Sequence, residues 1–179
     1  MADLAMKMLH GYLDKELAKF KTKSPSDEQV KEAILNAFDT LEKEWVDLAR
    51  MAFPRGYAQV AQVGACALVS VVHNNKIYTA SAGDSKAVIY RENSPHQFER
   101  VKISKTFNAN KKYEQTRLVA AFPKEEDVVV CMKGVEKACY VKGMRMPTRA
   151  FGDLVLKHAE FNFHSYMPGM GYQPPIPKG

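Results

Sequence analysis

The sequence predicts an α+β fold in which helices come first and a run of antiparallel strands follows. Two patterns along the chain lead to this prediction. Up to about residue 50, apolar residues recur every three or four positions, which is the spacing of amphipathic helices. From Val63 onward, short β-rich apolar runs alternate with turn residues, which is typical of hairpins. This order favours antiparallel sheets over the parallel sheet of a Rossmann-type fold.

The composition predicts a single globular domain. The chain has 179 residues, of which 46% are hydrophobic and 26% are charged, and this is enough to build a core. No apolar run approaches the ~20 residues that a membrane-spanning helix needs, and the N-terminus lacks the continuous apolar stretch of a secretory leader. We therefore expect no membrane partner.

Two amphipathic helices are predicted at the N-terminal end. The apolar face of the first consists of Leu9, Tyr12, Leu13, Leu17 and Phe20. Ser26 stands three residues before Gln29, which is the spacing of a capping box and predicts where the second helix begins. The apolar face of the second consists of Val30, Ile34, Phe38, Leu41, Trp45 and Leu48. This helix is expected to end near Arg50.

The elements that follow are short and separated by turns. Their expected ranges are a central strand over 65–73, further strands over 76–82, 86–92 and 96–104, a short helix over 110–122, a hairpin over 127–143 and a loop over 146–153. Residues 166–179 are rich in proline and glycine and predict an extended segment after a domain that spans 1–165.

The cysteines predict an intracellular protein. Cys66, Cys131 and Cys139 form no CxxC pair, and an odd number of cysteines in apolar surroundings favours reduced, buried thiols. Cys66 lies in the predicted central strand and is expected to be a core thiol. Cys131 and Cys139 flank the last hairpin and could face each other, but a disulfide is not expected inside a cell.

The net charge of the protein excludes few classes of function. The formal net charge is +6 and the sequence pI is about 9.1. Because the lysines and arginines are scattered, they predict an ordinary solvated surface, and we expect no nucleic-acid partner. The five histidines and the cysteines show no zinc-ligand spacing.

Three stretches of the sequence resemble, in order, motifs of the metal-dependent serine/threonine protein phosphatases of the 2C type. Residues 64–90, GACALVSVVHNNKIYTASAGDSKAVIY, resemble a strand–strand–GDSR–strand block. Residues 103–123, ISKTFNANKKYEQTRLVAAFP, are similar to a Leu-Ser-x-Asp-His-x-Ala stretch followed by a helix that carries Glu and Arg. Residues 146–162, MPTRAFGDLVLKHAEFN, resemble an Arg-Ala-Phe/Leu-Gly-Asp block. The sequences of these three stretches are most similar to plant and protist members and to the pyruvate dehydrogenase phosphatase branch.

The resemblance implies part of an α-β-β-α sandwich, with two antiparallel sheets between helical layers and a binuclear Mg or Mn centre at one end. It also implies an incomplete domain, because the DGH-G-G motif, the phosphate-binding arginine and two downstream aspartates of the family have no counterpart here. Within the matched part, Thr106-Phe107 stands in place of Asp-His, and Lys86 stands in place of the GDSR arginine.

Asp84, in the turn Gly83-Asp84-Ser85, is the remaining candidate metal ligand. The resemblance implies that it helps to hold a weaker third metal. A turn aspartate also accepts backbone N–H groups in an Asx-turn. For this chain alone we expect the Asx-turn, because a lone carboxylate binds Mg²⁺ poorly. When the missing segments are joined to it, we expect the ligand role.

The last block adds residues with a supporting role. Asp153 either orients ligands or waters beside the metal centre or caps the turn after Gly152. Arg149 is expected to pair with Asp153 or with another buried carboxylate. No catalytic side chain is assigned, and Ser85 is not a nucleophile because nothing supplies a base.

The sequence is compatible with two functions. In the first, the chain is part of a phosphatase that hydrolyses phosphoserine and phosphothreonine by metal-activated water, and by itself it is inactive and binds no metal. In the second, it is a non-catalytic phosphatase-like module for binding or assembly. In both, a partner chain or strand exchange in a homodimer is expected to cover the exposed sheet edges. A phosphoprotein is the expected substrate of an active enzyme.

Overall fold

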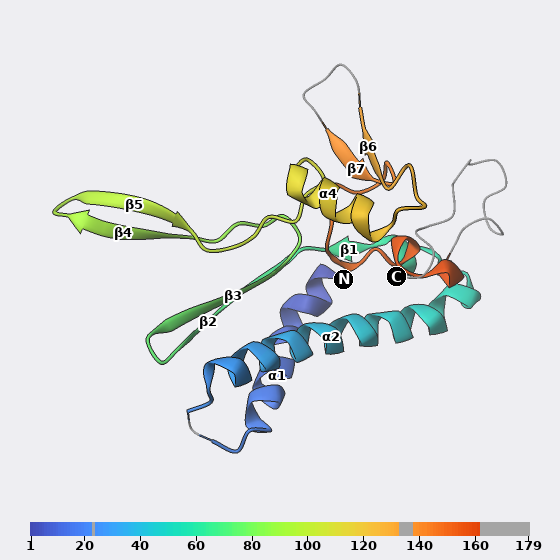
Figure 1. Ribbon diagram of the computed structural model, residues 1–179. Helices are drawn as coiled ribbons and strands as arrows, with labels where there is room; N and C mark the ends of the chain where they lie inside the picture. The colour runs from blue at the N-terminus through green and yellow to red at the C-terminus, as the bar shows by residue number, and fades with distance from the viewer. Residues whose placement is uncertain (23, 133–137, 162–179) are drawn as a thin grey trace.

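The computed structural model describes residues 1–22, 24–132 and 138–161, and the predicted extended segment 166–179 lies outside them. Two long helices come first, and the strands that follow all pair antiparallel (Figure 1). The predicted α+β class is therefore confirmed. None of the described helices combines the length and the hydrophobicity needed to cross a membrane.

The two N-terminal helices are α1 (Ala2–Ala18) and α2 (Asp27–Ala52). The predicted capping box begins α2: the Gln29 amide donates to Ser26 Oγ (3.3 Å) and the Ser26 amide donates to Gln29 Oε1 (2.9 Å). The hydroxyl of Tyr12 donates to Glu44 and so fastens α1 to α2. This hydrogen bond, together with burial, raises the pKa of Tyr12 to about 12.

The strands form four two-stranded sheets in the part of the chain that the structure describes. Their pairs are β1 (Gly64–Ala65) with β8 (Phe151–Gly152), β2 (Ala67–His73) with β3 (Lys76–Ala82), β4 (Val88–Ser94) with β5 (Gln97–Lys102), and β6 (Val129–Cys131) with β7 (Cys139–Val141). Asn74 and Asn75 join β2 to β3 with φ angles of 47° and 59°, which suit a tight hairpin turn. The short helix α4 (Lys112–Ala121) follows β5.

The predicted central strand over 65–73 is wrong in two respects. The extended run breaks at Cys66, which separates β1 from β2. Within the described residues, β2 has only β3 beside it, so β2 is an edge strand. A nearly all-apolar sequence indicates burial on both faces, but it does not tell which strands the chain itself supplies.

The prediction of three reduced cysteines is also wrong. A disulfide joins Cys131 to Cys139. The register of β6 and β7 places the two residues directly opposite each other, and such antiparallel pairs bring side chains close enough to bond. Since free thiols were the basis for the expected intracellular location, that location is not supported by these two cysteines.

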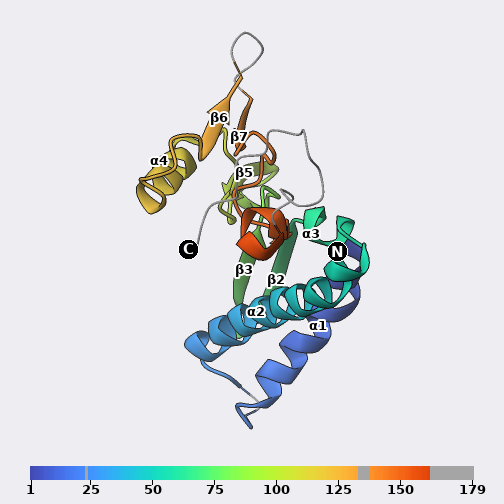
Figure 2. The same ribbon diagram turned by 90° about the vertical axis from the view of Figure 1, so that its right-hand side faces the viewer.

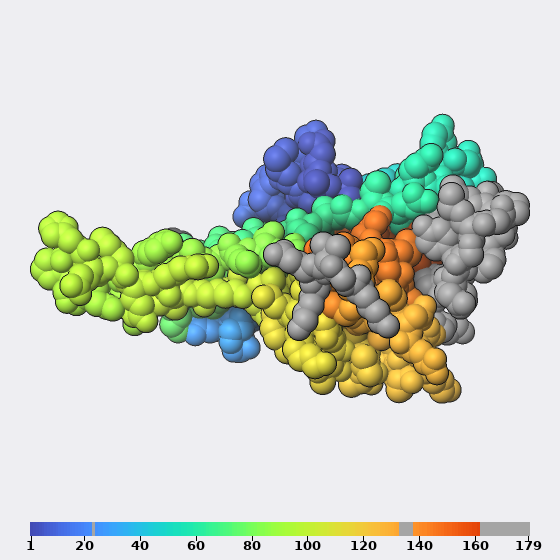
Figure 3. All heavy atoms as spheres, turned by 90° about the horizontal axis from the view of Figure 1, so that it is seen from above, coloured from blue at the N-terminus to red at the C-terminus, as the bar shows by residue number. Residues whose placement is uncertain are grey.

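The helices α1 and α2 cover one face of the β2–β3 hairpin (Figures 1 and 2). Side chains on that face of β2, Ala67 and Val69, pack against a buried cluster that includes Leu9 of α1 and Leu41 of α2. A second core lies between α4 and the β6–β7 hairpin around Leu118. Seen from above, the β4–β5 hairpin extends from the body of the protein as a narrow arm (Figure 3).

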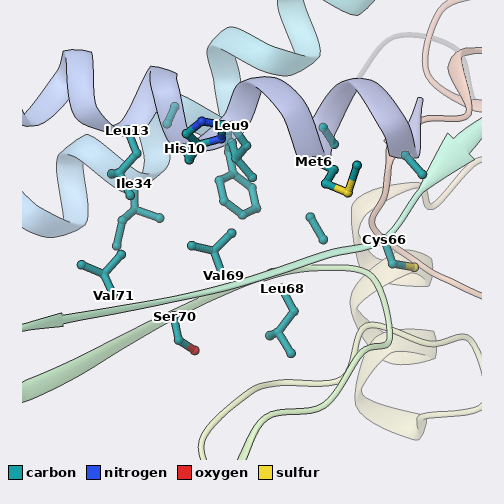
Figure 4. Close-up of a pocket in the computed structure, with 15 residues that line it drawn as sticks. Met6, Leu9, His10, Leu13, Ile34, Cys66, Leu68, Val69, Ser70 and Val71 are labelled. Carbon is teal, nitrogen blue, oxygen red and sulfur yellow. The ribbon is translucent and has the colours of Figure 1, made fainter.

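An apolar groove of about 490 Å³ runs between α1 and β2. Figure 4 shows Leu9 and Leu13 of α1 on the side of the helix that faces β2, with Val69 and Val71 of β2 pointing toward them, while Leu68 points to the opposite side of the strand. On that opposite side, Val72 remains 73% exposed. We call the space between α1 and the free edge of β2 the β2 groove.

The packing of α2 predicts different costs for two leucine truncations. Leu41 is completely buried, whereas Leu35 on the same helix is 64% exposed. Leu41→Ala removes buried methyl groups and leaves a cavity, so we expect it to lower the free energy of unfolding by about 2–5 kcal/mol. Leu35→Ala, the matched control, should change it by less than about 0.5 kcal/mol. Urea unfolding followed by circular dichroism measures both, and equal losses would show that the described core is wrong.

Candidate functional site

The three sequence blocks meet at the turn that carries Asp84. The backbone amide of Phe107 donates to the carbonyl oxygen of Gly83 (3.0 Å), and the carbonyl oxygen of Phe107 accepts from the amide of Thr148 (3.0 Å). The amide of Ala109 donates to the carbonyl oxygen of Met146 (2.8 Å). The segment 107–109 therefore lies between the turn and the loop 146–148 and is hydrogen-bonded to both. We call this arrangement the motif junction.

Asp84 is half-buried and held by two side chains. Its Oδ2 accepts a hydrogen bond from Asn108 Nδ2 (2.7 Å), and its Oδ1 faces the sulfur of Cys66 at 3.6 Å. Because both hydrogen bonds come from side chains, they differ from the Asx-turn bonds expected of this carboxylate. Ser85 is also half-buried, and Lys86 is exposed.

Cys66 is exposed rather than a core thiol, which corrects the prediction. Cys66 lies in the break between β1 and β2, and the strand pairing therefore does not place its side chain in the core. The sulfur nevertheless lies against Gly83. Partial burial of the sulfur, together with the negative charge of Asp84, raises the pKa of the Cys66 thiol.

A buried carboxylate, Glu114, fastens α4 to the motif junction. It is fully buried and accepts hydrogen bonds from Arg117 Nη2 (2.7 Å) and from Thr148 Oγ1 (2.6 Å), with Lys105 Nζ 3.6 Å away. Burial alone would raise the pKa of Glu114, but these hydrogen bonds and the positive charges outweigh burial and lower it. The sequence contained a signal for this contact, namely the Glu and Arg on the helix of the second block, but no role was predicted for them.

The residues at the family's Asp-His position have structural contacts. Thr106 is buried, and its hydroxyl accepts a hydrogen bond from Lys102 Nζ (2.7 Å). The ring of Phe107 lies close to two cations: the guanidinium carbon of Arg149 is 4.9 Å from the ring centre and Lys105 Nζ is 5.5 Å from it. Such cation–π contacts stabilise exposed cations only modestly.

Of the two partners expected for Arg149, Asp153 or another buried carboxylate, Asp153 is contradicted by the structure. Arg149 is exposed and lies over Phe107, whereas Asp153 is buried and accepts from Arg145 Nε (2.8 Å). Arg145 also donates to the carbonyl oxygen of Gln62 (2.7 Å). It therefore connects Gln62 with Asp153, two residues whose separation along the chain does not indicate that they are neighbours.

Asp153 and Gly152 are both shaped by the β1–β8 pairing. The Asp153 side chain makes no helix-capping hydrogen bond, which contradicts the capping interpretation. Its φ angle is 48°, and its amide donates to the carbonyl oxygen of Val63 (2.9 Å). Gly152 has a φ angle of 70°, and a Cβ atom there would lie 2.3 Å from the same oxygen. The turn after Gly152 is therefore held by backbone contacts.

The described residues do not by themselves fit a binuclear metal centre. Among the described residues, no group of three or more His, Cys, Asp or Glu side chains could hold an ion. Asp84 offers one carboxylate, and Asp153 is already paired with Arg145. Magnesium and manganese prefer about six oxygen ligands. Further ligands would have to come from outside the part of the chain that the structure describes.

Comparison with known proteins gives one consistent family. The family model described as Protein phosphatase 2C matches residues 2–174. The chain is 33% identical over 138 residues to Probable protein phosphatase 2C 48 of Arabidopsis thaliana, an alignment that covers 76% of this chain and 35% of that protein. It is 34% identical over 132 residues to Probable protein phosphatase 2C 64 of the same plant (73% and 32%). It is 30% identical over 138 residues to Probable protein phosphatase 2C 36 of Oryza sativa subsp. japonica (76% and 35%). The chain thus spans about a third of the length of these curated relatives.

The turn before Asp84 predicts a strong requirement for glycine at position 83. Gly83 has a φ angle of +117°, and a Cβ atom there would lie 2.3 Å from the sulfur of Cys66. Gly83→Ala is expected to lower the free energy of unfolding by ~2–4 kcal/mol, since it adds backbone strain to a steric overlap. Gly11→Ala on α1, where a Cβ atom meets nothing within 4 Å, should be neutral or stabilising by up to ~1 kcal/mol. Denaturant unfolding of both variants is the measurement, and a neutral Gly83→Ala would contradict the turn geometry.

The lowered pKa of Glu114 predicts an acid-sensitive contribution to stability. Because the folded-state pKa lies below its ordinary value of 4.5, the contribution is complete above about pH 4.5 and is lost as the pH falls through the folded-state value. Glu114→Gln should therefore be less stable than the wild type at pH 7, and this difference should shrink toward pH 3. The exposed Glu126→Gln serves as the control and should follow the wild-type curve. Urea titrations from pH 7 to pH 3 decide the matter, and parallel curves for wild type and Glu114→Gln would refute this role.

Proposed function

Because the chain belongs to the protein phosphatase 2C family, we propose that it forms part of a metal-dependent serine/threonine protein phosphatase. The proposed reaction is hydrolysis of phosphoserine and phosphothreonine in proteins by metal-activated water, with Mg²⁺ or Mn²⁺ as cofactor. The observation that carries the proposal is the motif junction, where three separate blocks of family sequence converge on Asp84. A phosphoprotein is the proposed substrate.

Asp84 is the residue proposed to contact a metal. Asn108 occupies its Oδ2 and fixes the orientation of the carboxylate, so Oδ1 is the oxygen left on the side of Cys66. Gly83 and Ser85 form the turn around Asp84. The Asp153 carboxylate packs against Gly64 of β1 and is held there by Arg145, which gives it a structural role. Arg149 is exposed at the junction and is available to a substrate.

By itself the chain is proposed to be inactive. A two-metal hydrolase needs several carboxylates to hold its ions about 3.5–4 Å apart, and Asp84 supplies one of them. The relatives are about three times as long as the region that they share with this chain, so the other ligands have room in the sequence that lies outside it. The complete site then requires those segments, on a longer chain or on a partner chain.

The second candidate function, a non-catalytic module for binding or assembly, is favoured by the β2 groove. Apolar side chains of α1 and β2 line the groove (Figure 4), and among the described residues β2 pairs with β3 alone, which leaves its other edge open to a further strand. An extended segment that adds to β2 would pair with the backbone groups of that edge and cover the apolar wall. For this second function, we propose that the segment comes from a partner chain, and strand exchange between two copies is the homodimeric form of the same contact.

The test measures Mn²⁺-dependent phosphate release from a phosphothreonine peptide. The 179-residue chain is compared with a chimera that adds the remaining segments of the Arabidopsis relative 2C 48. We expect no release above background by the chain alone and Mn²⁺-dependent release by the chimera. Asp84→Ala in the chimera should lower the rate at limiting Mn²⁺ at least tenfold, whereas Asp14→Ala on the exposed side of α1 should leave it unchanged.

Two other outcomes would contradict parts of the proposal. Release by the chain alone that depends on Mn²⁺ and on Asp84 would show that a metal site assembles without the missing segments, and the proposed inactivity would be wrong. A folded chimera without turnover would disprove the phosphatase proposal and favour the non-catalytic module.

A further inference from the structure

We propose that the Cys131–Cys139 disulfide is a thiol-exchange site, at which a small cellular thiol or dithiol attacks Cys131. We further propose that the state of this bond controls the order of residues 108–110 beside Asp84. The inference goes beyond the phosphatase reaction and does not depend on it. It rests on three features of the described residues: unequal burial of the two cysteines, a hydrogen-bond donor at one sulfur, and a chain of hydrogen bonds to the motif junction.

The two halves of the disulfide differ in exposure. Cys131 is exposed, whereas Cys139 is 4% exposed and packs in the core beside Leu118 and Val128. Thiol–disulfide exchange requires an incoming thiolate to approach one sulfur along the S–S bond. The exposed residue is the accessible target, so Cys139 is the leaving group.

The structure provides a hydrogen-bond donor for that leaving group. Gln115 Nε2 lies 3.4 Å from Cys139 Sγ and also donates to the carbonyl oxygen of Ala109 (2.7 Å). The amide is therefore held in place before exchange begins. A donor at this position stabilises the thiolate that forms on Cys139, and a more stable leaving thiolate departs faster.

The exchange balances with a dithiol as reductant. Its first thiolate forms a bond to Cys131 Sγ, the Cys131–Cys139 bond breaks, and the electron pair stays on Cys139, which takes up a proton from solvent. The second thiolate of the reductant then attacks the reductant sulfur bound to Cys131 and releases Cys131, which is protonated in turn. The dithiol becomes a disulfide, and the protein gains two thiols.

The disulfide is connected to Asp84 through two asparagines. The amide of Cys139 donates to Asn110 Oδ1 (2.6 Å), and the amide of Asn110 donates to Asn108 Oδ1 (2.9 Å). Asn108 in turn donates to Asp84 Oδ2. Among the described residues, the β6–β7 ladder pairs three residues on each strand, and a cross-link stabilises so short a ladder. Reduction should therefore loosen Cys139, then Asn110, and finally the orientation of Asp84.

The first experiment compares the reactivity of the two cysteines in a Cys66→Ser background, which removes the third thiol. Variants with Cys139→Ser or Cys131→Ser each retain one cysteine, and each is treated with glutathione disulfide and analysed by intact mass spectrometry. We expect Cys131 to form the mixed disulfide at least tenfold faster than Cys139. Equal rates, or a faster Cys139, would overturn the proposed direction of attack.

The second experiment uses the wild-type chain and needs no variant that could fail to fold. Hydrogen exchange at single amides is followed by NMR in the oxidised protein and after dithiothreitol treatment. We expect exchange at Cys139 and Asn110 to rise at least tenfold on reduction, and exchange at Leu41 in α2 to stay unchanged. The proposal is wrong if the oxidised protein contains no Cys131–Cys139 bond or if reduction leaves the Asn110 amide as protected as before.

Discussion

The backbone of residues 107–109 must satisfy hydrogen bonds on two sides at once, and the candidate site depends on this constraint. On one side Phe107 binds the carbonyl of Gly83, and on the other Phe107 and Ala109 bind the loop 146–148. Buried backbone groups left without partners are costly, so the three segments are held together as a unit. Asp84 owes its orientation to that unit, because Asn108 extends from the middle segment to its carboxylate.

Glu114 supports the same unit from behind. A fully buried carboxylate is tolerated only when positive charge and hydrogen bonds compensate its lost hydration. Arg117 and Thr148 provide this compensation, and Thr148 belongs to the loop that also binds Phe107. Helix α4 therefore both packs on the β6–β7 hairpin and fixes the loop. A separate chain of hydrogen bonds connects Cys139 on that hairpin to Asp84, through Asn110 and Asn108.

The two helices and the β2–β3 hairpin both have apolar surface that the described residues leave uncovered. The two helices pack on one face of the β2–β3 hairpin, and apolar residues of α1, α2 and β2 line the β2 groove (Figures 2 and 4). Exposed apolar side chains such as Val72 and Ile77 lie on the other face of the hairpin. An edge strand with apolar surface on both sides favours association with another segment. The aligned region covers about a third of the length of the 2C relatives.

The sequence by itself determined the local elements, because their signals are local. Helical spacing and the Ser26–Gln29 capping box predicted α2, and the Asn74-Asn75 turn predicted the first hairpin. The three motifs, in their order along the chain, also identified Asp84 as the candidate metal ligand. Only the tertiary structure decided which distant groups meet: that Arg145 rather than Arg149 pairs with Asp153, that Glu114 reaches Thr148, and that Cys131 bonds Cys139 while Cys66 is exposed. These contacts depend on the register of strands and the path of loops, which residue spacing along the chain does not encode.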